Sequence, residues 1–236
     1  MREHISGQYD AELDAIRGHV MEMGGIVESQ LRDACDALLA VDAELAEAVV
    51  ARDDEVNRLE ILVDDQCNHI IARRQPAAGD LRLVMSIVKT ITDLERIGDE
   101  ATRVAKMTVE LSGLGRPREA GPELRTMTRG VRDMLRAALD AFARVDVEAA
   151  VENIARDKAI DRAYDAFVER LLPEMEQSPQ EIRRLLDLLW CARSFERIGD
   201  HAKNVSEYVI YLGRGQDVRH LPLERKRREA EPGGRS

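Results

Sequence analysis

Apolar residues recur every three or four positions along most of the chain, and this spacing predicts α-helices. The first helix is predicted from eight apolar residues on one face, namely Leu13, Ile16, Val20, Met23, Val27, Leu31, Ala34 and Leu38. A turn follows, with Asp42 as a candidate N-cap for a second helix that continues to about Arg74. Proline and glycine within residues 75–80 break the pattern, and Asp80 is a candidate cap for a third helix ending near Leu111.

The same pattern returns after residues 112–122, a segment whose three glycines and two prolines predict a linker. A fourth helix is predicted from the apolar face Leu124, Val131, Leu135 and Leu139. A fifth helix runs to about Met175. Ser178 and Pro179 are a candidate N-cap and first-turn pair for a sixth helix, which ends near Gly213.

Two short sequence words occur in both halves of the chain. Glu-Arg-Ile-Gly-Asp occupies residues 95–99 and 196–200, and Ala-Arg-Asp occupies residues 51–53 and 155–157. The halves are therefore an internal repeat of three helices, and their short connections favour antiparallel neighbours. We predict an all-α fold: a tandem repeat of two antiparallel three-helix bundles with six long helices.

The predicted bundles cover residues 1–112 and 122–213, and we expect the charged tail at 214–236 to be flexible. Aromatic residues make up only 3% of the chain, which favours helices over a sheet. The net charge of -10 argues against nucleic-acid partners and against direct binding to an anionic membrane. The N-terminus is polar, the three cysteines are scattered, and no uncharged apolar run approaches the ~18 residues of a membrane span. We therefore expect a cytoplasmic protein that meets the membrane only through its partners.

Acidic residues form a row on one helix face in each half, because residues four apart on a helix are neighbours. Each row pairs with acidic or amide side chains predicted on the second helix of its bundle. The rows contain Glu95, Asp99, Asp53 and Asn57 in the first half, and Glu196, Asp200, Asp157 and Asp161 in the second half. Converging carboxylates form an oxygen-rich site that suits hard cations such as Mg²⁺, Mn²⁺ or iron.

An arginine network is the alternative interpretation of these rows. Arginines also recur in the repeat, at 52 and 156, 58 and 162, and 96 and 197, and they could neutralise the carboxylates. The residues by themselves leave both interpretations open. Because Asn57 stands where the second half has Asp161, we expect a metal site in the first half to be the weaker one.

Catalytic signatures are absent, since the chain has no Walker loop, no GxGxxG, no Gly-x-Ser-x-Gly and no HExxH. We therefore expect no enzymatic activity. His201 is expected to be a lone surface histidine, and Trp190 and Phe195 are expected to pack in the core. Gly98 and Gly199 lie inside predicted helices, where we expect them to allow close helix approach.

Long distinctive segments of the chain resemble the PhoU family of bacterial regulators of phosphate uptake. They include HISGQYDAEL at 4–13, ARRQPAAGDLRLVM at 72–85, LERIGD at 94–99, CARSFERIGD at 191–200 and GQDVRH at 215–220. The resemblance implies a cytoplasmic protein of two three-helix bundles that is usually a homodimer. It also implies a non-enzymatic adaptor between the ATPase subunit of the phosphate ABC transporter and the sensor histidine kinase of the phosphate two-component system. Such an adaptor is a negative regulator of the phosphate-starvation (Pho) regulon and damps high-affinity uptake.

The resemblance also bears on the acidic rows, because the Glu/Asp-x-x-x-Asp motifs of some family members bind metal clusters. Carried over by position, these motifs correspond to Glu95, Asp99, Glu196 and Asp200, with Asp53, Asp157 and Asp161 on the partner helices. The metal is Mg, Mn, Fe or Zn in this interpretation. Two further classes compete with the adaptor: a carboxylate-bridged metal-binding bundle with a storage or catalytic role, and a purely structural scaffold.

Overall fold

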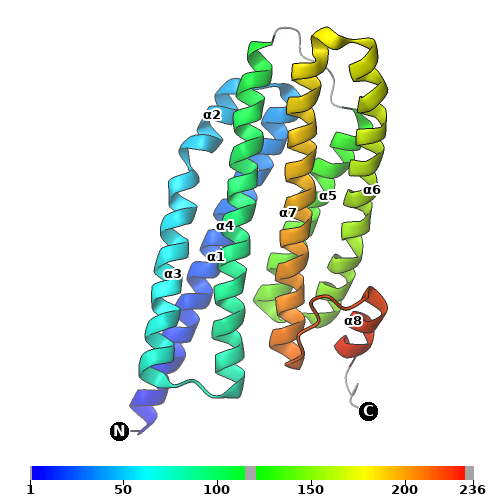
Figure 1. Cartoon of the computed structure of the whole chain (residues 1–236). Coiled ribbons are helices and arrows are strands. Elements are labelled where there is room, and N and C mark those ends of the chain that lie inside the picture. Colours follow the sequence, from blue (N-terminus) through cyan, green and yellow to red (C-terminus); the bar gives the residue numbers. More distant parts are fainter. Residues whose placement is uncertain (1, 115–120, 232–236) are drawn as a thin grey trace.

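The computed structural model describes residues 2–114 and 121–231, and every regular element within them is a helix (Figure 1). In chain order the elements are α1 (Arg2–Ala40), α2 (Ala43–Ala51), α3 (Asp53–Arg74), α4 (Ala78–Gly113), α5 (Pro122–Arg144), α6 (Val147–Gln177), the 3₁₀ turn η1 (Pro179–Glu181), α7 (Ile182–Arg214) and α8 (Leu223–Ala230). The middle of the predicted linker, residues 115–120, lies outside the described residues.

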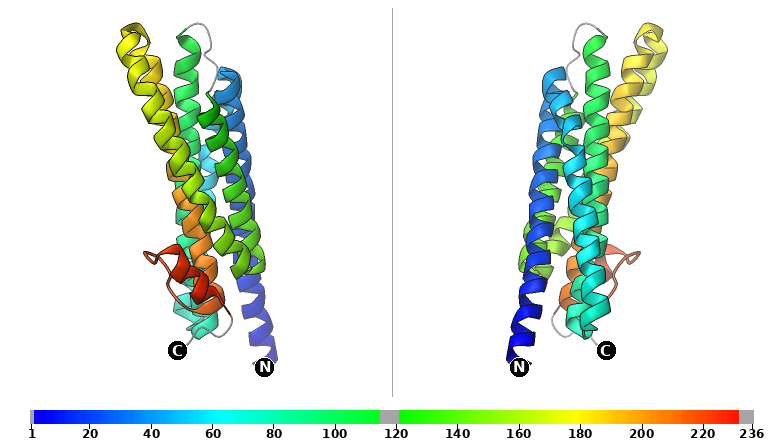
Figure 2. Two further views of the ribbon diagram at one scale, coloured as in Figure 1. Left: turned by 90° about the vertical axis from the view of Figure 1, so that its right-hand side faces the viewer. Right: turned by 90° about the vertical axis from the view of Figure 1, so that its left-hand side faces the viewer.

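The predicted tandem repeat of two antiparallel three-helix bundles is confirmed. The first bundle contains α1, the α2–α3 pair and α4, and the second contains α5, α6 and α7. The bundles lie side by side, with α4 packed along α7 and α1 packed against α5. The axes of the long helices are nearly aligned, whether the chain runs up or down them, so the molecule is much longer than it is wide (Figure 2).

Local capping explains where the second helix of each bundle begins. Asp42 accepts a hydrogen bond from the Leu45 backbone N–H at 3.1 Å, which confirms its predicted role as an N-cap. Asp146 repeats this cap at the start of α6. Asp80 was predicted to cap α4, and this prediction was wrong: Ala77 is the N-cap, and Asp80 accepts a hydrogen bond from the Tyr9 hydroxyl.

The predicted second helix of the first bundle is broken into α2 and α3 at Arg52. The Arg52 guanidinium donates to Asp33 on α1 at 2.6 Å, across the first bundle. Because of the break, Asp53 lies in the first turn of α3. The corresponding helix of the second bundle, α6, continues without interruption from Val147 to Gln177.

The C-terminal segment differs from the expected flexible tail, because its described part contains helix α8. Lys226 on α8 forms an ion pair with Glu207 on α7, and both side chains are buried. Arg214 at the end of α7 donates to the carbonyl of Ala230 at 2.9 Å. Residues 232–236 lie outside the described part of the chain.

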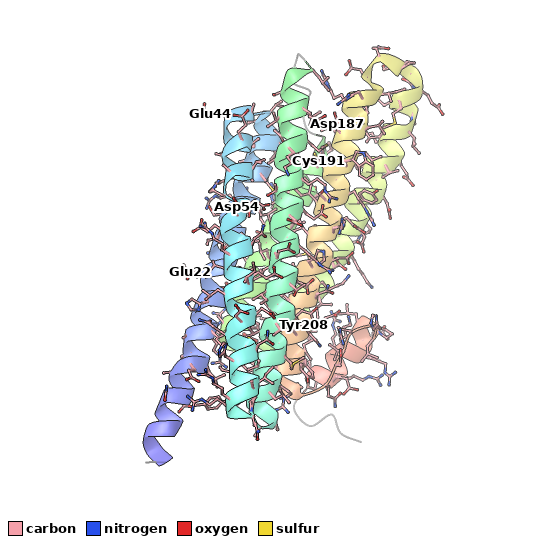
Figure 3. The ribbon with its side chains drawn as sticks, turned by 60° about the vertical axis from the view of Figure 1, so that its left-hand side comes forward. Glu22, Glu44, Asp54, Asp187, Cys191 and Tyr208 are labelled. Carbon is pink, nitrogen blue, oxygen red and sulfur yellow. The ribbon has the colours of Figure 1, made fainter. Side chains whose placement is uncertain are left out.

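Burial corrects one expectation about the core. Phe195 is fully buried as predicted, but Trp190 is 57% exposed, so its predicted place in the core was wrong. Cys191 is buried and free, as are the other two cysteines. Figure 3 shows Cys191 and Asp187 toward one end of α7, and Tyr208 on the part of α7 near α8. In the described part of the chain, no helix is long and apolar enough to cross a membrane.

Candidate functional site

The first acidic cluster lies between α3 and α4 and contains Asp53, Glu60, Glu95 and Asp99. Burial raises the pKa of Glu95, and the nearby charges of Asp99 and Glu60 raise it further. Burial and the charge of Asp53 likewise raise the pKa of Asp99. The structure therefore brings together the three predicted acids of this half. Glu60 was missed, although it lies seven residues after Asp53 and so on the same helix face.

Neutral side chains hold Asp53 in this cluster. Its carboxylate accepts hydrogen bonds from Thr102 at 2.9 Å and from Gln30 at 3.3 Å. The side-chain oxygen of Gln30 is buried without a hydrogen-bond partner, beside Gly98 of the repeated word. Among the described residues, none of the four carboxylates in this cluster forms an ion pair with a basic side chain. The first cluster thus holds its negative charge without a direct ion pair, although Arg96 is near enough to lower the pKa of Glu95.

The second acidic cluster lies between α6 and α7 and contains Asp157, Asp161, Glu196 and Asp200, all of them predicted. Burial raises the pKa of Glu196. The positive charge of Arg193 acts in the opposite direction, and the charges of the other three carboxylates raise this pKa further. Burial and Asp157 raise the pKa of Asp161. The structure therefore places these four side chains within electrostatic reach of one another.

Lys203 distinguishes the second cluster from the first. Its ammonium group donates to Asp157 and to Asp200, both at 2.5 Å. Burial by itself would lower the pKa of Lys203, but the hydrogen bonds to Asp157 and Asp200 raise it above its usual value. Lys203 lies 101 residues after Thr102, the same offset as the repeated word, so a lysine stands in the second half where the first has a threonine.

Two of the recurring arginines pair with carboxylates outside the clusters, whereas Arg96 lies near enough to Glu95 and Glu60 to lower their pKa values. Arg52 binds Asp33, and Arg197 binds Glu100 on α4 at 2.6 Å. The cations of the second cluster are instead Lys203 and Arg193, which pairs with Glu196 at 2.8 Å. The second cluster therefore has direct ion pairs, though with cations other than the recurring arginines. The first cluster has basic side chains only at longer range, namely Arg96, Arg103 and Lys106.

The donor chemistry of both clusters fits a hard cation, because every side chain in them offers carboxylate oxygens. In the second cluster, Asp157 and Glu196 each keep one buried oxygen without a hydrogen-bond partner. Across residues 2–114 and 121–231, however, no three acidic, histidine or cysteine side chains are already arranged around a common point as metal ligands. Metal coordination would therefore need side-chain rotation in either half.

A buried polar network joins α4 to α7, and the sequence did not predict it. Asp93 accepts hydrogen bonds from Tyr208 at 2.7 Å and from Asn204 at 3.2 Å, and its carboxylate lies 2.6 Å from His201 Nδ1. His201 is only 8% exposed, so its expected place on the surface was wrong. Because Asp93 and His201 lie 108 positions apart, no local pattern marks this contact.

Comparison with known proteins identifies the family. A family model described as PhoU domain matches residues 20–108 and 124–209, one match in each bundle. The chain belongs to the PhoU family. It is 47% identical over 231 residues to the phosphate-specific transport system accessory protein PhoU homolog of Pseudomonas putida, which covers 98% of this chain and 90% of that relative. It is 45% identical to the accessory protein PhoU of Escherichia coli K12, covering 94% of this chain and 91% of that relative.

Solved structures of the PhoU family have the same fold. The crystal structure of PhoU from Pseudomonas aeruginosa matches with a TM-score of 0.86 and 46% identity, over 88% of this chain and all of that one. The regulatory protein PhoU from Streptococcus pneumoniae matches with a TM-score of 0.81 at 26% identity, over 89% of this chain and 99% of that one. The two-bundle arrangement is therefore common to the family and not peculiar to this chain.

Proposed function

We propose that this protein is a non-catalytic, cytoplasmic adaptor that regulates phosphate uptake. In this role it contacts the ATPase subunit of the phosphate ABC transporter and the sensor histidine kinase, and it keeps the Pho regulon off when phosphate is plentiful. The observation that carries the proposal is the similarity, over 98% of the chain, to a protein named as an accessory protein of phosphate-specific transport. An adaptor needs only different affinities for two states of its partners, and no chemical step.

An exposed apolar stripe on α7 offers a surface for such a partner. Ile182, Leu186 and Trp190 are four residues apart, so they share one helix face. Their exposed fractions are 38%, 41% and 57%. Tryptophan is enriched among the residues that dominate binding energy at protein interfaces. Trp190 is therefore the side chain on which partner binding would depend most.

Two experiments test the adaptor proposal. Deletion of the gene should switch a starvation-promoter reporter on in high phosphate, and only while the transporter and kinase are present. Pull-down with the ATPase subunit or the kinase's cytoplasmic part should recover the protein, and Trp190→Ala should reduce the recovery at least tenfold. Leu172→Ala is the matched control, because Leu172 is an apolar side chain of similar exposure (58%) on a different helix, α6. A silent reporter together with no recovery of either partner would refute the proposal.

The cation site in this proposal is the first acidic cluster. We expected the stronger site in the second half from the sequence, but we propose the first because Lys203 already pairs with two carboxylates of the second cluster. Lys203 already supplies a positive charge to the second cluster, whereas Thr102 offers the first only a neutral hydroxyl. Burial and the neighbouring carboxylates raise the pKa values of Glu95 and Asp99, and a bound Mg²⁺ or Mn²⁺ would offset the repulsion among those carboxylates. We also propose that the protein is a homodimer. Light scattering of the full chain would measure its molar mass in solution and so test this part of the proposal.

A further inference from the structure

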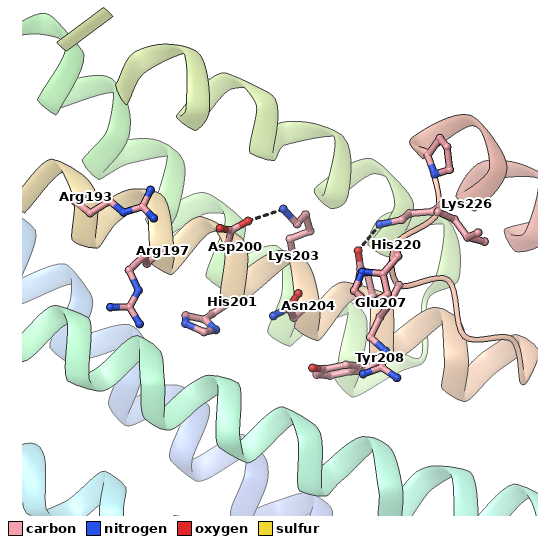
Figure 4. A pocket seen from close by; sticks show the side chains of 13 residues that line it. Arg193, Arg197, Asp200, His201, Lys203, Asn204, Glu207, Tyr208, His220 and Lys226 are labelled. Carbon is pink, nitrogen blue, oxygen red and sulfur yellow. Dashed lines mark hydrogen bonds and ion pairs between the residues drawn. The ribbon is translucent and has the colours of Figure 1, made fainter. Parts of the chain in front are cut away.

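A pocket of about 860 Å³ lies along α7 from Arg193 to Tyr208, and we call it the α7 groove. Its α7 lining includes Arg193, Arg197 and Asn204, which share one helix face with the exposed stripe described above. Residues 219–222 and Lys226 of the C-terminal segment line the groove near the end of α7 (Figure 4). Helix α7 and the C-terminal segment thus form one concave surface together. The volume of the pocket lies in the range of small-molecule sites.

The lining of the groove is basic although the chain carries a net charge of -10. Five of its side chains are cationic and two are carboxylates: Arg193, Arg197, Lys203, Arg219 and Lys226 against Asp200 and Glu207. The two lysines pair with the two carboxylates, Lys203 with Asp200 and Lys226 with Glu207. Three arginines therefore remain as the groups with which a ligand would interact.

Ion pairs hold two of these arginines in place without using all of their hydrogen-bond donors. Arg197 contacts Glu100 through one terminal nitrogen, and Glu100 is itself 2% exposed and fixed between α4 and α7. Arg193 contacts Glu196 through one terminal nitrogen. An arginine carries five N–H donors in a rigid fork, so most donors of each side chain remain for a ligand. The side chains of Arg193 and Arg197 are 48% and 41% exposed, which leaves them within reach of solvent.

Arg219 approaches the groove from the C-terminal segment. Asp217 binds its Nε and one terminal nitrogen, which orients the guanidinium and leaves the other terminal nitrogen for a ligand. Arg219 is close enough to Tyr208 to interact with it electrostatically. Tyr208 lies fifteen residues after Arg193, which is about 22 Å along the helix. The free donors are therefore spread along the groove and not gathered at one point.

We propose that the α7 groove binds an extended anion with several phosphate groups in a row, either a linear polyphosphate or the phosphate chain of a nucleotide. Arginine forks match phosphate oxygens in geometry and form charge-assisted hydrogen bonds with them. A single phosphate ion reaches at most the neighbouring Arg193 and Arg197 and not Arg219 as well, whereas a chain of phosphates contacts all three in succession. The carboxylate partners Glu100, Glu196 and Asp217 lie outside the groove lining, so they orient the arginines without occupying the ligand's place.

Calorimetric titration of the full chain tests the proposal and does not depend on the adaptor role. The protein is titrated at constant ionic strength, with a chelator present, with phosphate, tripolyphosphate, a longer linear polyphosphate and ATP. Affinity should rise at least tenfold from phosphate to tripolyphosphate, and further with chain length. ATP binding more tightly than tripolyphosphate would identify a nucleotide as the ligand, and equal affinity would identify the phosphate chain itself.

Arginine substitutions at the two ends of the groove locate the binding. Arg193→Gln and Arg219→Gln should each weaken binding of the long polyphosphate roughly five- to tenfold, because each loses a charge-assisted contact. Arg183→Gln is the matched control, since Arg183 is on α7, is 71% exposed and pairs with Glu110 away from the groove. Circular dichroism and the melting temperature verify that the variants fold. Arg193 and Arg219 are partly exposed and pair with Glu196 and Asp217, which lie near them in sequence. Arg193 also lies over the Tyr164 ring of α6 at 5.9 Å, so the melting temperature of its variant is the check that this lost contact leaves the fold intact.

Four results would overturn the proposal. The first is phosphate binding as tightly as tripolyphosphate. The second is citrate binding as tightly as tripolyphosphate, which would show a general attraction for anions. The third is unchanged affinity in folded Arg193→Gln and Arg219→Gln proteins. The fourth is binding that requires added Mg²⁺, which would assign the anion to a metal held by an acidic cluster and not to the arginines.

Discussion

Exchanging Thr102 and Lys203 should exchange the affinities of the two acidic clusters for a divalent cation. In the second cluster a metal must displace an ammonium group that donates to both Asp157 and Asp200. A hydrogen bond to a charged group contributes about 1.5–3 kcal/mol. Lys203 is partly exposed, so the lower figure applies to each bond, and the two together make about 3 kcal/mol. That free energy corresponds to roughly a hundredfold in affinity.

We therefore expect Lys203→Thr to raise the Mn²⁺ affinity of the second cluster roughly a hundredfold. Thr102→Lys should lower the affinity of the first cluster by a similar factor, because the new ammonium group would lie beside Asp53. Calorimetry and electron paramagnetic resonance of Mn²⁺ on metal-free protein measure both affinities and the number of ions bound. The two substitutions combined should move the ion from the first cluster to the second.

Two controls separate the charge of the lysine from other effects of the exchange. Lys158→Thr makes the same change in charge at an exposed position of α6 and should leave Mn²⁺ binding within about threefold of the original protein. Thr102→Val removes the hydroxyl without adding charge and should cost less than tenfold, the equivalent of about one neutral hydrogen bond. Equal Mn²⁺ affinity in the original protein, Lys203→Thr and Thr102→Lys would refute the reasoning.

Three further predictions follow from named contacts. Asp93→Ala should lower the free energy of unfolding, measured by chemical denaturation, by about 3–5 kcal/mol, because it leaves the buried donors of the α4–α7 network unpaired. The control is Asp140→Ala at an exposed position, which should change the free energy of unfolding by less than about 0.5 kcal/mol. The pKa of Glu95 is higher in the folded than in the unfolded state, so the contribution of Glu95 to stability falls as pH rises through that pKa. At pH 7 the metal-free Glu95→Gln variant should therefore be more stable than the original protein by a few tenths of a kcal/mol. This difference should vanish below about pH 4, where Glu95 is protonated in both states. Gly199→Ala should raise the melting temperature, with a gain of up to about 1 kcal/mol, because a Cβ there would meet its neighbours at ordinary distances of 3.5 Å or more; a lower melting temperature would show that close helix approach requires this glycine.

Local periodicity explains why so much of the fold was predictable. A helix buries residues three and four apart, so the apolar spacing by itself predicts six long helices, and the repeated words predict that the halves are alike. The Asp42 cap was also predictable, because a capping side chain binds a backbone group only three residues away. The break at Arg52 was not, since the arginine is held by Asp33 on another helix.

The acidic rows show the same division between sequence and tertiary structure. Residues four apart on one helix must be neighbours, so the pairs Glu95–Asp99 and Glu196–Asp200 follow from the sequence alone. Which cation meets them depends on how helices pack. Lys203 reaches Asp157, 46 positions away, because α6 and α7 lie side by side.

The contacts between the halves were decided by tertiary structure alone. Asp93 meets His201, and Arg197 meets Glu100, because α4 packs along α7. The α7 groove likewise exists because the C-terminal segment lies against α7, where Lys226 pairs with Glu207. A one-dimensional pattern records the face on which a side chain lies but not the distant residue that the face will meet. For this protein the sequence determined the helices and their acidic faces, and packing determined which charges those faces share.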